Sequence, residues 1–465
     1  MRAAALVILL SAVSSQAAEI PSRALAVIER YVRAEMALNE IPGLTLAIVA
    51  GDHTELRAYG VKDLASGEPM RVDTPVELAS VSKPLTAMAV ARLARAGRLD
   101  PDRPLSDYLA ELRGAPLGRV LVRDLVRHRS GLRRRHDRLA PCCGRPGDRD
   151  LNLAVRRLRS ATPARWVAGR FSYANSNYLL LAALIERVSG QPFARFMEQE
   201  IFRTLGMDRT TLSEGQARAW GLAASHERSW GRIRRRPAGE AGWLGASLVK
   251  STAPDMAAFA RAALEGRVDG IEQPEGLVPP YDAGWFIRRE DGLLVLEHSG
   301  DTWGANSAIL LIPARQLGVA VLINAGVQRA MPIARGIARC LLYGSAPEPA
   351  RPPWFQVADN WAMFFTGLSV LSLCALGTVW LRLRNALRRG ERQWIWPQGV
   401  WERGRLLLLL AMSAYLLALA LRPAVSAVPG SPSSLRVGLA ALSLAASAGL
   451  LTVAGLAVLR RPPQL

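Results

Sequence analysis

Three uncharged, strongly apolar runs near the C-terminus constrain the fold of this chain more than any other feature. They cover Trp361–Leu381, Leu406–Leu421 and Val437–Leu459. A proline-rich linker over residues 345–360 separates them from the preceding sequence. The first and third runs are long enough to cross a bilayer, and Arg405 and Arg422 can snorkel from the ends of the shorter second run. A single buried helical domain is the alternative, but the uniform lack of charged residues argues against it. We therefore expect three transmembrane helices.

The arginines around these runs indicate their orientation. The connection between the first two runs carries seven arginines, which are Arg382, Arg384, Arg388, Arg389, Arg392, Arg403 and Arg405. The connection between the second and third runs carries only Arg422 and Arg436, both at its edges. The positive-inside rule then places the first connection and the tail over residues 460–465 in the cytoplasm, and the residues before Trp361 outside. Tryptophans flank the runs, as in an interfacial belt: Trp354, Trp361, Trp394, Trp396 and Trp401.

The N-terminus has the pattern of a secretory signal peptide. Met1 and Arg2 precede an apolar stretch over Ala3–Val13, and small residues follow it. We expect residues 1–18 to be removed, by cleavage after Ala17 or Ala18. An uncleaved N-terminal anchor is the alternative. Export would place the next part of the chain outside the cytoplasm, which agrees with the charge of the C-terminal connections.

Residues 19–344 have the pattern of one globular unit of the α+β class. Strand patterns occur at both of its ends, over residues 43–50, 53–59, 293–297, 305–312 and 318–324. Helical patterns cover residues 22–38 and 328–342 and dominate residues 80–263. The simplest assembly is one antiparallel sheet built from both ends of the unit, flanked by helices, with a helical subdomain inserted between the early and late strands.

The tetrapeptide Ser80-Val-Ser-Lys83 has the pattern S-x-x-K and precedes an apolar run that predicts a helix. At the start of a helix, Ser80 and Lys83 share one face. The lysine amine can then accept the serine proton, and the helix N-terminus favours the negative charge that develops on the serine. The composition supports a chemical role, because Lys62, Lys83 and Lys250 are the three lysines among 59 basic residues. A buried lysine can lose its proton, whereas an arginine keeps it.

A second segment, Phe171–Tyr178, precedes an apolar helical pattern and contains Tyr173 and Asn175 as Y-x-N. A phenol can relay protons, and an amide can bind both the lysine and a substrate carbonyl. An aromatic packing anchor followed by an asparagine cap is the alternative for this segment taken alone. Next to S-x-x-K, the pattern indicates a second wall of a reactive site.

A third segment reads Glu-His-Ser-Gly-Asp and lies between two strand patterns. His298 and Ser299 can line one wall of a cleft, and Gly300 would let a substrate approach the backbone closely. The backbone N–H groups of Asp301 and Ser80 can together form an oxyanion hole. Taken alone, a His-Ser-Gly sequence is usually a turn.

In this order, the three motifs resemble the serine beta-lactamase and penicillin-recognising enzyme family, and in particular its class C beta-lactamase-like serine hydrolases. The resemblance covers the whole predicted α+β unit and includes four further segments: Leu125–Leu132, Ile201–Met207, Ser251–Ala257 and Leu317–Asn324. It implies that Ser80 is the acylated nucleophile and that Lys83 and Tyr173 form the acid/base pair. It also implies that Asn175 orients the lysine and the substrate, and that His298 is the third-motif residue.

One departure from the family pattern affects the expected substrate. Typical beta-lactamases and transpeptidases carry a lysine in the third motif, where it helps to hold the substrate carboxylate, whereas this chain has His298. The resemblance therefore favours esterase-like or aminopeptidase-like members over penicillin hydrolysis. The basic loop Arg133–Asp137 can supply positive charge for an anionic substrate if it lies near the cleft, and a solvated loop is the alternative.

Other functional classes receive little support from the composition. The formal net charge is +20, but the arginines are dispersed and no helix-turn-helix or zinc-finger spacing occurs, so we do not expect nucleic-acid binding. The chain lacks H-E-x-x-H, Cys-x-x-Cys and Gly-rich phosphate motifs, so we expect no metal, nucleotide or other cofactor. Cys142 or Cys143 can pair with Cys340 in an exported domain, and Cys374 lies in the first apolar run.

The sequence therefore predicts a serine hydrolase that is tethered to the cytoplasmic membrane, with its catalytic unit on the periplasmic or extracellular side. We expect it to act through an acyl-enzyme on an ester or amide, and small esters, D-amino-acid peptides, cell-wall fragments and beta-lactams are candidate substrates. The alternative is a penicillin-binding-type sensor that is acylated slowly and signals through its membrane helices. Known sensors of that kind carry a cytoplasmic metalloprotease motif, which this chain lacks.

Overall fold

The computed structural model describes residues 20–139, 150–164, 168–236, 243–267, 281–352, 358–391, 393–394, 399–421, 442–443, 445–452 and 459–460. A seven-stranded antiparallel sheet lies at the centre of the N-terminal part, with the strand order β2-β1-β11-β10-β9-β8-β7. Its strands are β1 (Gly43–Ala50), β2 (His53–Gly60), β7 (Tyr281–Asp282), β8 (Trp285–Glu290), β9 (Leu293–Asp301), β10 (Asn306–Ile312) and β11 (Leu317–Ile323).

The sheet joins the two ends of the globular unit, as the sequence predicts. Strand β1 pairs with β11 in a register that places Ala47 opposite Ala320. Strands β10 and β11 are buried along their whole length, because helices cover both of their faces. Such strands are nearly continuous apolar runs rather than alternating ones. Strand β2, at one edge, is only partly buried and carries charged side chains, which discourage pairing with another chain.

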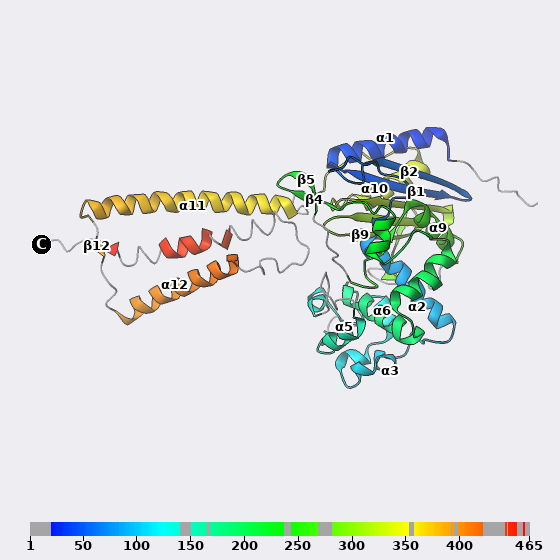
Figure 1. Cartoon of the computed structure of the whole chain (residues 1–465), viewed down its shortest axis with the longest axis horizontal. Coiled ribbons are helices and arrows are strands. Elements are labelled where there is room, and N and C mark those ends of the chain that lie inside the picture. The colour runs from blue at the N-terminus through cyan, green and yellow to red at the C-terminus, as the bar shows by residue number, and fades with distance from the viewer. Residues whose placement is uncertain are drawn as a thin grey trace, which may run out of the picture.

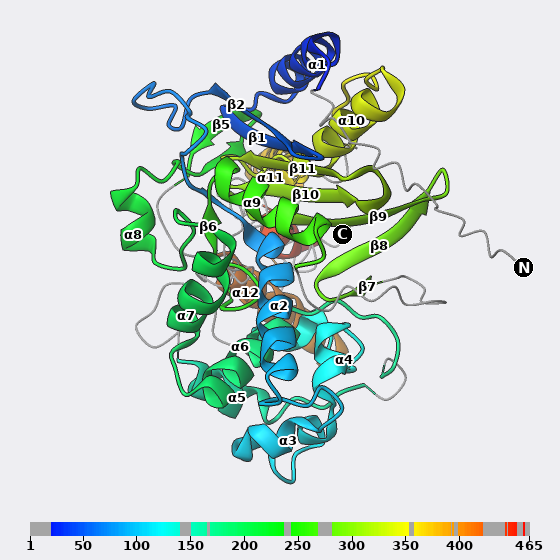
Figure 2. The same ribbon diagram turned by 90° about the vertical axis from the view of Figure 1, so that its right-hand side faces the viewer.

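Two layers of helices enclose the sheet, and both views show them (Figures 1 and 2). Helices α1 (Ser22–Asn39) and α10 (Ala330–Tyr343) pack on one face. Helix α9 (Ala253–Leu264) and the helical subdomain pack on the other. Helix α10 ends where Gly344 takes the left-handed conformation, with φ of 73° and its N–H bonded to the carbonyl of Cys340.

The helical subdomain is inserted between the early and late strands. Its α-helices are α2 (Ser82–Arg95), α3 (Leu105–Tyr108), α4 (Val122–Val126), α5 (Leu151–Leu158), α6 (Asn175–Ser189), α7 (Phe193–Phe196) and α8 (Glu214–Ala219). The turn η7 (Pro313–Arg315) lies outside it, between β10 and β11. Short turns of other helical types within the subdomain are η1 (Ala79–Val81), η2 (Ala110–Leu112), η3 (Pro116–Arg119), η4 (Arg134–Arg138), η5 (Met197–Phe202) and η6 (Arg203–Leu205). Two small strand pairs, β3 (Val76–Glu77) with β6 (Lys250–Ser251) and β4 (His226–Ser229) with β5 (Arg232–Arg235), complete it.

Some boundaries differ from the predicted ones. Strands β7 and β8 were not predicted, and β9 continues to Asp301 rather than ending at Glu297. The outer strand β8 carries Arg288 and Glu290, whose charges obscure its apolar alternation. Helix α2 begins two residues later than the predicted start at Ser80, which itself lies in η1.

The C-terminal region lies to one side of the sheet and its helices (Figure 1). It contains α11 (Ala358–Arg388), α12 (Val400–Leu421) and a short pair, β12 (Gln393–Trp394) with β13 (Leu459–Arg460). Among the described residues, one helix, Asn360–Arg388, is long and apolar enough to cross a membrane, where the sequence predicts three spans. The second predicted span lies in α12. The third is described mainly over residues 442–443 and 445–452, which are helical.

Candidate active site

The turn that carries Ser80 is held from both sides before any substrate arrives. Ala79, the preceding residue, has φ of 48°, in the left-handed region that is unfavourable for a residue with a Cβ atom. The N–H of Leu78 donates to the carbonyl of Val249 at 2.8 Å, and the Ser307 hydroxyl donates to the carbonyl of Leu78 at 2.5 Å. Contacts from the sheet and from the segment before β6 therefore stabilise the strained backbone on which the serine stands.

Ser80 Oγ is the point at which the predicted catalytic residues meet. Lys83 Nζ lies 2.8 Å from it and Tyr173 Oη lies 2.9 Å from it. The lysine comes from the first turn of α2, and the tyrosine comes from the loop that enters α6. The structure thus brings together two motifs that are 93 residues apart in the sequence.

The partners of Lys83 indicate which way its hydrogen bonds run. The side chain is fully buried, and Nζ lies 3.0 Å from Asn175 Oδ1 and 2.9 Å from the carbonyl oxygen of Ala246, in addition to Ser80 Oγ. Burial lowers the pKa of Lys83 well below its usual value, the nearby Asp137 carboxylate opposes that shift, and the Arg134 guanidinium adds to it. A neutral amine has two N–H donors and one lone pair. Because an amide oxygen and a carbonyl can only accept, the lone pair is left for the Ser80 hydroxyl.

Tyr173 is packed among other rings and remains a neutral phenol. The centre of its ring lies 4.4 Å from that of the His128 ring and 4.8 Å from Lys83 Nζ. Burial raises the pKa of Tyr173 above its usual value, and the hydrogen bond with Ser80 partly offsets that shift. Burial likewise lowers the pKa of His128 well below its usual value, so this imidazole is a neutral support for the tyrosine. Tyr173 can therefore donate its proton to Ser80 Oγ while Lys83 accepts one.

Asp137, the last residue of the basic loop, is a member of the site to which the sequence analysis gave no role of its own. Its buried carboxylate accepts the backbone N–H of Asn175 at 3.1 Å and that of Ser176 at 2.8 Å, which caps the N-terminus of α6. This cap fixes the residue that presents its amide oxygen to Lys83. The bond spans 38 residues of sequence, so the local patterns that identify caps could not find it.

His298 faces the same cluster, but its imidazole is almost fully buried. Its Nδ1 lies 2.7 Å from the carbonyl oxygen of Ser299, and Nε2 lies 3.3 Å from Tyr281 Oη. A carbonyl can only accept, so Nδ1 carries the proton. Burial lowers the pKa of His298 to about 3, with a contribution from the charge of Lys83. The predicted role of His298 and Ser299 in substrate binding stays a prediction, and the structure adds that this imidazole supplies no positive charge at neutral pH.

Gly300 and Asp301 bring the end of β9 against the Ser80 turn. A Cβ atom on Gly300 would lie 2.1 Å from the carbonyl oxygen of Leu78, so this close approach requires glycine. The N–H of Thr302 donates to the carbonyl of Ala305, and hydrogen-bonded pairs alternate with non-bonded ones along an antiparallel ladder. The next pair, Asp301 with Asn306, is therefore a non-bonded one, and the N–H of Asp301 points away from β10.

The structure also bears on the predicted roles of the basic loop and the cysteines. The basic loop does reach the cluster, because the Arg134 guanidinium carbon lies 5.9 Å from the centre of the Tyr173 ring. Cys340 is buried in α10 and Cys374 is on α11, whereas the expected partners Cys142 and Cys143 and the signal-peptide residues 1–18 lie outside the described residues. Over the part of the chain that the structure describes, no three His, Cys, Asp or Glu side chains are grouped as metal ligands.

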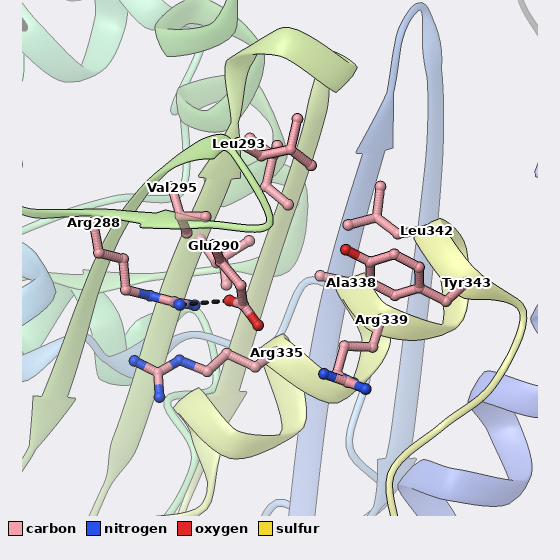
Figure 3. Close-up of a pocket in the computed structure, with 11 residues that line it drawn as sticks. Arg288, Glu290, Leu293, Val295, Arg335, Ala338, Arg339, Leu342 and Tyr343 are labelled. Carbon is pink, nitrogen blue, oxygen red and sulfur yellow. Dashed lines mark hydrogen bonds and ion pairs between the residues drawn. The ribbon is translucent and has the colours of Figure 1, made fainter.

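A separate hollow lies on the other face of the sheet, between the β8–β10 strands and α10 (Figure 3). Its floor is apolar, with Val295 and Leu310, and arginines such as Arg335 and Arg339 stand at its rim. The close-up shows the Arg288 guanidinium directed at the Glu290 carboxylate. None of the residues of the Ser80 cluster lines this hollow, so it is distinct from the candidate active site.

Comparison with known proteins shows the family of this chain and supports the same fold. A model of the family described as Beta-lactamase matches residues 28–339. Esterase EstB of Burkholderia gladioli is 35% identical over 214 residues, which are 42% of this chain and 53% of the esterase. A beta-lactamase of Pseudomonas fluorescens is 23% identical over 342 residues, covering 64% of this chain and 92% of that protein. The chain covers 53%, 58% and 62% of three such curated relatives.

Solved structures share the fold. The octameric penicillin-binding protein homologue from Pyrococcus abyssi superposes with a TM-score of 0.60 at 22% identity, over 70% of this chain and 78% of that one. A D-alanine carboxypeptidase AmpC from Burkholderia cenocepacia superposes with a TM-score of 0.56 at 24% identity, over 68% and 99%. A class C beta-lactamase from Rhodobacter sphaeroides gives 0.55 at 23% identity, over 70% and 99%. The α+β architecture of sheet, flanking helices and inserted helical subdomain is thus a known one.

Proposed function

This chain belongs to the beta-lactamase family of serine hydrolases, and from that premise we propose that it hydrolyses an ester or amide through an acyl-enzyme on Ser80. The observation that carries the proposal is the convergence on Ser80 Oγ of one base and one acid, Lys83 Nζ at 2.8 Å and Tyr173 Oη at 2.9 Å. A buried neutral lysine is a strong proton acceptor beside a hydroxyl, which is otherwise a weak nucleophile.

Acylation would proceed in balanced proton steps. Lys83 takes the hydroxyl proton as Ser80 Oγ bonds to the carbonyl carbon, and the carbonyl oxygen becomes an oxyanion. Tyr173 gives its proton to the leaving oxygen or nitrogen as that bond breaks, and the proton held by Lys83 returns to Tyr173. In deacylation a water molecule loses its proton to the same pair, its oxygen bonds to the acyl carbon, and Ser80 recovers a proton as the acid leaves.

Two backbone donors support the oxyanion in this proposal. One is the N–H of Ser80, in the turn before α2. The other is the N–H of Asp301, which the β9–β10 register directs away from its neighbouring strand and which lies next to that turn. Preorganised donors of this kind contribute about 3–4 kcal/mol each to lowering the barrier of acyl transfer. Asn175 holds Lys83, and its amide is also placed to contact a substrate carbonyl.

The neutral, buried His298 favours esters and small amides over penicillins as substrates. Its position is the one at which the family resemblance expects a lysine for the substrate carboxylate, and its imidazole carries no charge at neutral pH. The similarity to an esterase over 214 residues agrees with this preference. We keep a second candidate, a sensor that is acylated without turnover, because the C-terminal helices are joined to the same chain.

We also propose that residues 19–344 form the catalytic unit, that residues 345–360 link it to the membrane, and that it lies on the periplasmic or extracellular side. The apolar helix Asn360–Arg388 supports a membrane anchor. The segment after α12 contacts both other helices, through Ser413 with Ser447 at 2.8 Å and Trp380 with Thr452 at 2.8 Å. Small polar pairs of this kind often join transmembrane helices, which supports three spans.

The topology can be tested with protease added to intact spheroplasts. We expect the part before Trp361 to be digested while a tag after Leu465 stays protected until the membrane is opened. Protection of the catalytic unit in intact spheroplasts would contradict the proposed side of the membrane.

The hydrolase proposal can be tested with the full chain in detergent and its Ser80→Ala variant. Both are incubated with a chromogenic ester, a chromogenic cephalosporin and a D-alanyl peptide, while product release and the intact protein mass are followed together. Turnover that disappears in the variant supports the hydrolase. A lasting mass adduct on Ser80 without turnover supports the sensor, and equal turnover by both proteins would refute a role for Ser80.

A further inference from the structure

We propose that Arg134 selects substrates whose leaving group carries a negative charge, such as a carboxylate. The proposal rests on the hydrolase reaction above, since it concerns the same Ser80 site. It assigns substrate recognition to the turn η4, which lies outside the three motifs that identify the site.

The turn η4 is fixed firmly to the catalytic residues. Asp137, in this turn, accepts the N–H groups of Asn175 and Ser176 at the start of α6. At the beginning of the turn, His136 Nδ1 accepts the N–H of Arg133 at 2.9 Å. The backbone that carries Arg134 is therefore held in a defined position relative to the loop that carries Tyr173.

Arg134 presents an uncommitted charge beside that loop. Its guanidinium carbon lies 5.9 Å from the centre of the Tyr173 ring, and the residue is exposed. Among the described residues, no carboxylate lies within ion-pair distance of it. Its charge reaches the reactive groups, because it lowers the pKa values of both Lys83 and Tyr173. A guanidinium with free donors is well suited to bind a carboxylate through two parallel hydrogen bonds.

The other basic groups around Ser80 cannot serve this purpose. Lys83 is buried, and its amine is already engaged by Asn175 Oδ1, the Ala246 carbonyl and Ser80 Oγ. His298 is buried and uncharged at neutral pH. Within the described part of the chain, Arg134 is thus the cation that stands next to Tyr173 and remains accessible to a substrate.

The position of Arg134 also indicates which part of the substrate it meets. Tyr173 is the proposed proton donor to the leaving group, and the Arg134 guanidinium stands over the ring of the same tyrosine, so the leaving group departs near Arg134. A negative charge lies on the β9 side, where the Asp301 carboxylate raises the pKa of Tyr173 while the Arg134 guanidinium lowers it. Asp301 Oδ1 is held by Asn306 Nδ2 at 2.6 Å, and its pKa is raised to about 6 by desolvation. A negative charge is therefore favoured on the η4 side and disfavoured on the β9 side.

Two esters with the same acyl group test the proposal directly. The first is the phenylacetyl ester of 3-hydroxybenzoate, which has a leaving-group carboxylate. The second is the ester of 3-hydroxybenzamide, its neutral isostere. The full chain in detergent is compared with Arg134→Gln, with Arg134→Lys, and with Arg138→Gln as a matched control from an exposed site on the same turn. The quantity measured is the ratio of kcat/KM for the acid ester to kcat/KM for the amide ester.

We expect Arg134→Gln to lower this ratio about tenfold, because a hydrogen bond to a charged group typically contributes that factor to binding. Arg134→Lys should lower the ratio less, because the positive charge remains while the bidentate hydrogen bonding of the guanidinium is lost. Arg138→Gln should keep the ratio of the unmodified protein. An unchanged ratio in Arg134→Gln, or an equal fall in Arg138→Gln, would overturn the proposal while leaving the hydrolase intact. If neither ester is cleaved in a Ser80-dependent way, it is the hydrolase proposal that fails.

Discussion

Two buried lysines, Lys83 and Lys250, show how the same side chain is put to different uses in one molecule. They are 0% and 3% exposed. The amine of Lys83 is surrounded by neutral oxygen atoms, and no carboxylate of the described residues lies within ion-pair distance of it. Lys250 Nζ lies 3.3 Å from the Glu214 carboxylate, and its backbone pairs with that of Glu77 across β3 and β6.

The difference teaches that partners, rather than burial, decide what a buried lysine does. Burial penalises the ammonium ion, and only a nearby carboxylate compensates for that penalty. Without one, burial lowers the pKa of Lys83, as its proposed role as a base requires. With one, the side chain of Lys250 links β6 to α8. Substituting each lysine in turn tests whether the two have these different roles.

The largest effect is expected for Lys83→Met. Removing the proton acceptor should lower kcat/KM by about 10³-fold, within the range found for general bases. The free energy of unfolding should fall little, because the methionine fills a similar volume and a buried amine has been removed. Stopped-flow acylation and urea unfolding measure the two quantities. Retention of activity within about tenfold would exclude Lys83 as the base.

For Lys250→Met the effects should be reversed. The change leaves the Glu214 and Glu77 carboxylates without their lysine, so the free energy of unfolding should fall by about 3 kcal/mol. The value of kcat/KM should fall by less than about tenfold, because no reacting atom is touched. Urea unfolding together with ester hydrolysis measures both effects. A Lys250→Met protein that is as stable as the unmodified protein but inactive would contradict the different roles assigned to the two lysines.

Glu77 gives the comparison a pH dependence. Burial raises its pKa from 4.5 to about 7, and the Lys250 charge opposes that shift only in part. A carboxyl with a raised folded-state pKa binds more protons in the folded than in the unfolded protein between these two values. Its stabilising contribution is therefore complete below the unfolded pKa and is lost as the pH rises through about 7.

Consequently, Glu77→Gln should reduce the loss of stability between about pH 5 and about pH 8 by on the order of 2 kcal/mol. Urea unfolding of both proteins at the two pH values provides the measurement. Glu55→Gln, at a partly exposed site on β2, is a suitable control that should keep the original pH dependence. Parallel pH profiles for Glu77→Gln and the unmodified protein would contradict this account.

Residues that act through local patterns were predictable from the sequence, and residues that act through long-range contacts were not. Ser80 and Lys83 share a helical face, so their meeting follows from spacing alone. The sheet was predictable because β1, β10 and β11 are apolar strands with turns at their ends. The Asp137 cap, in contrast, joins segments that only the tertiary fold brings together.

Burial of a polar side chain is equally hard to predict from the sequence. His298 follows a strand pattern, and nothing in its neighbours indicates that Tyr281 will cover its Nε2 atom. Glu77 and Lys250 are far apart in the sequence, and their pairing depends on a strand pair of only two residues on each side. Such short pairs have no periodicity to detect. The meeting of Ser80, Lys83 and Tyr173 was therefore predictable, whereas their electrostatic environment required the structure.

The smallest expected effect, and the sharpest form of the comparison, comes from Lys250→Arg. Arginine preserves the charge and the pair with Glu214, so the cost should be limited to the larger volume at a 3% exposed site, about 1 kcal/mol. At Lys83 the same exchange should be as damaging to activity as methionine, because a guanidinium keeps its proton and cannot accept one from Ser80. Urea unfolding of Lys250→Arg and kcat/KM of Lys83→Arg test these two expectations. If Lys83→Arg were active, the serine would not need a proton acceptor at that position, and the distinction between the two lysines would rest on packing alone.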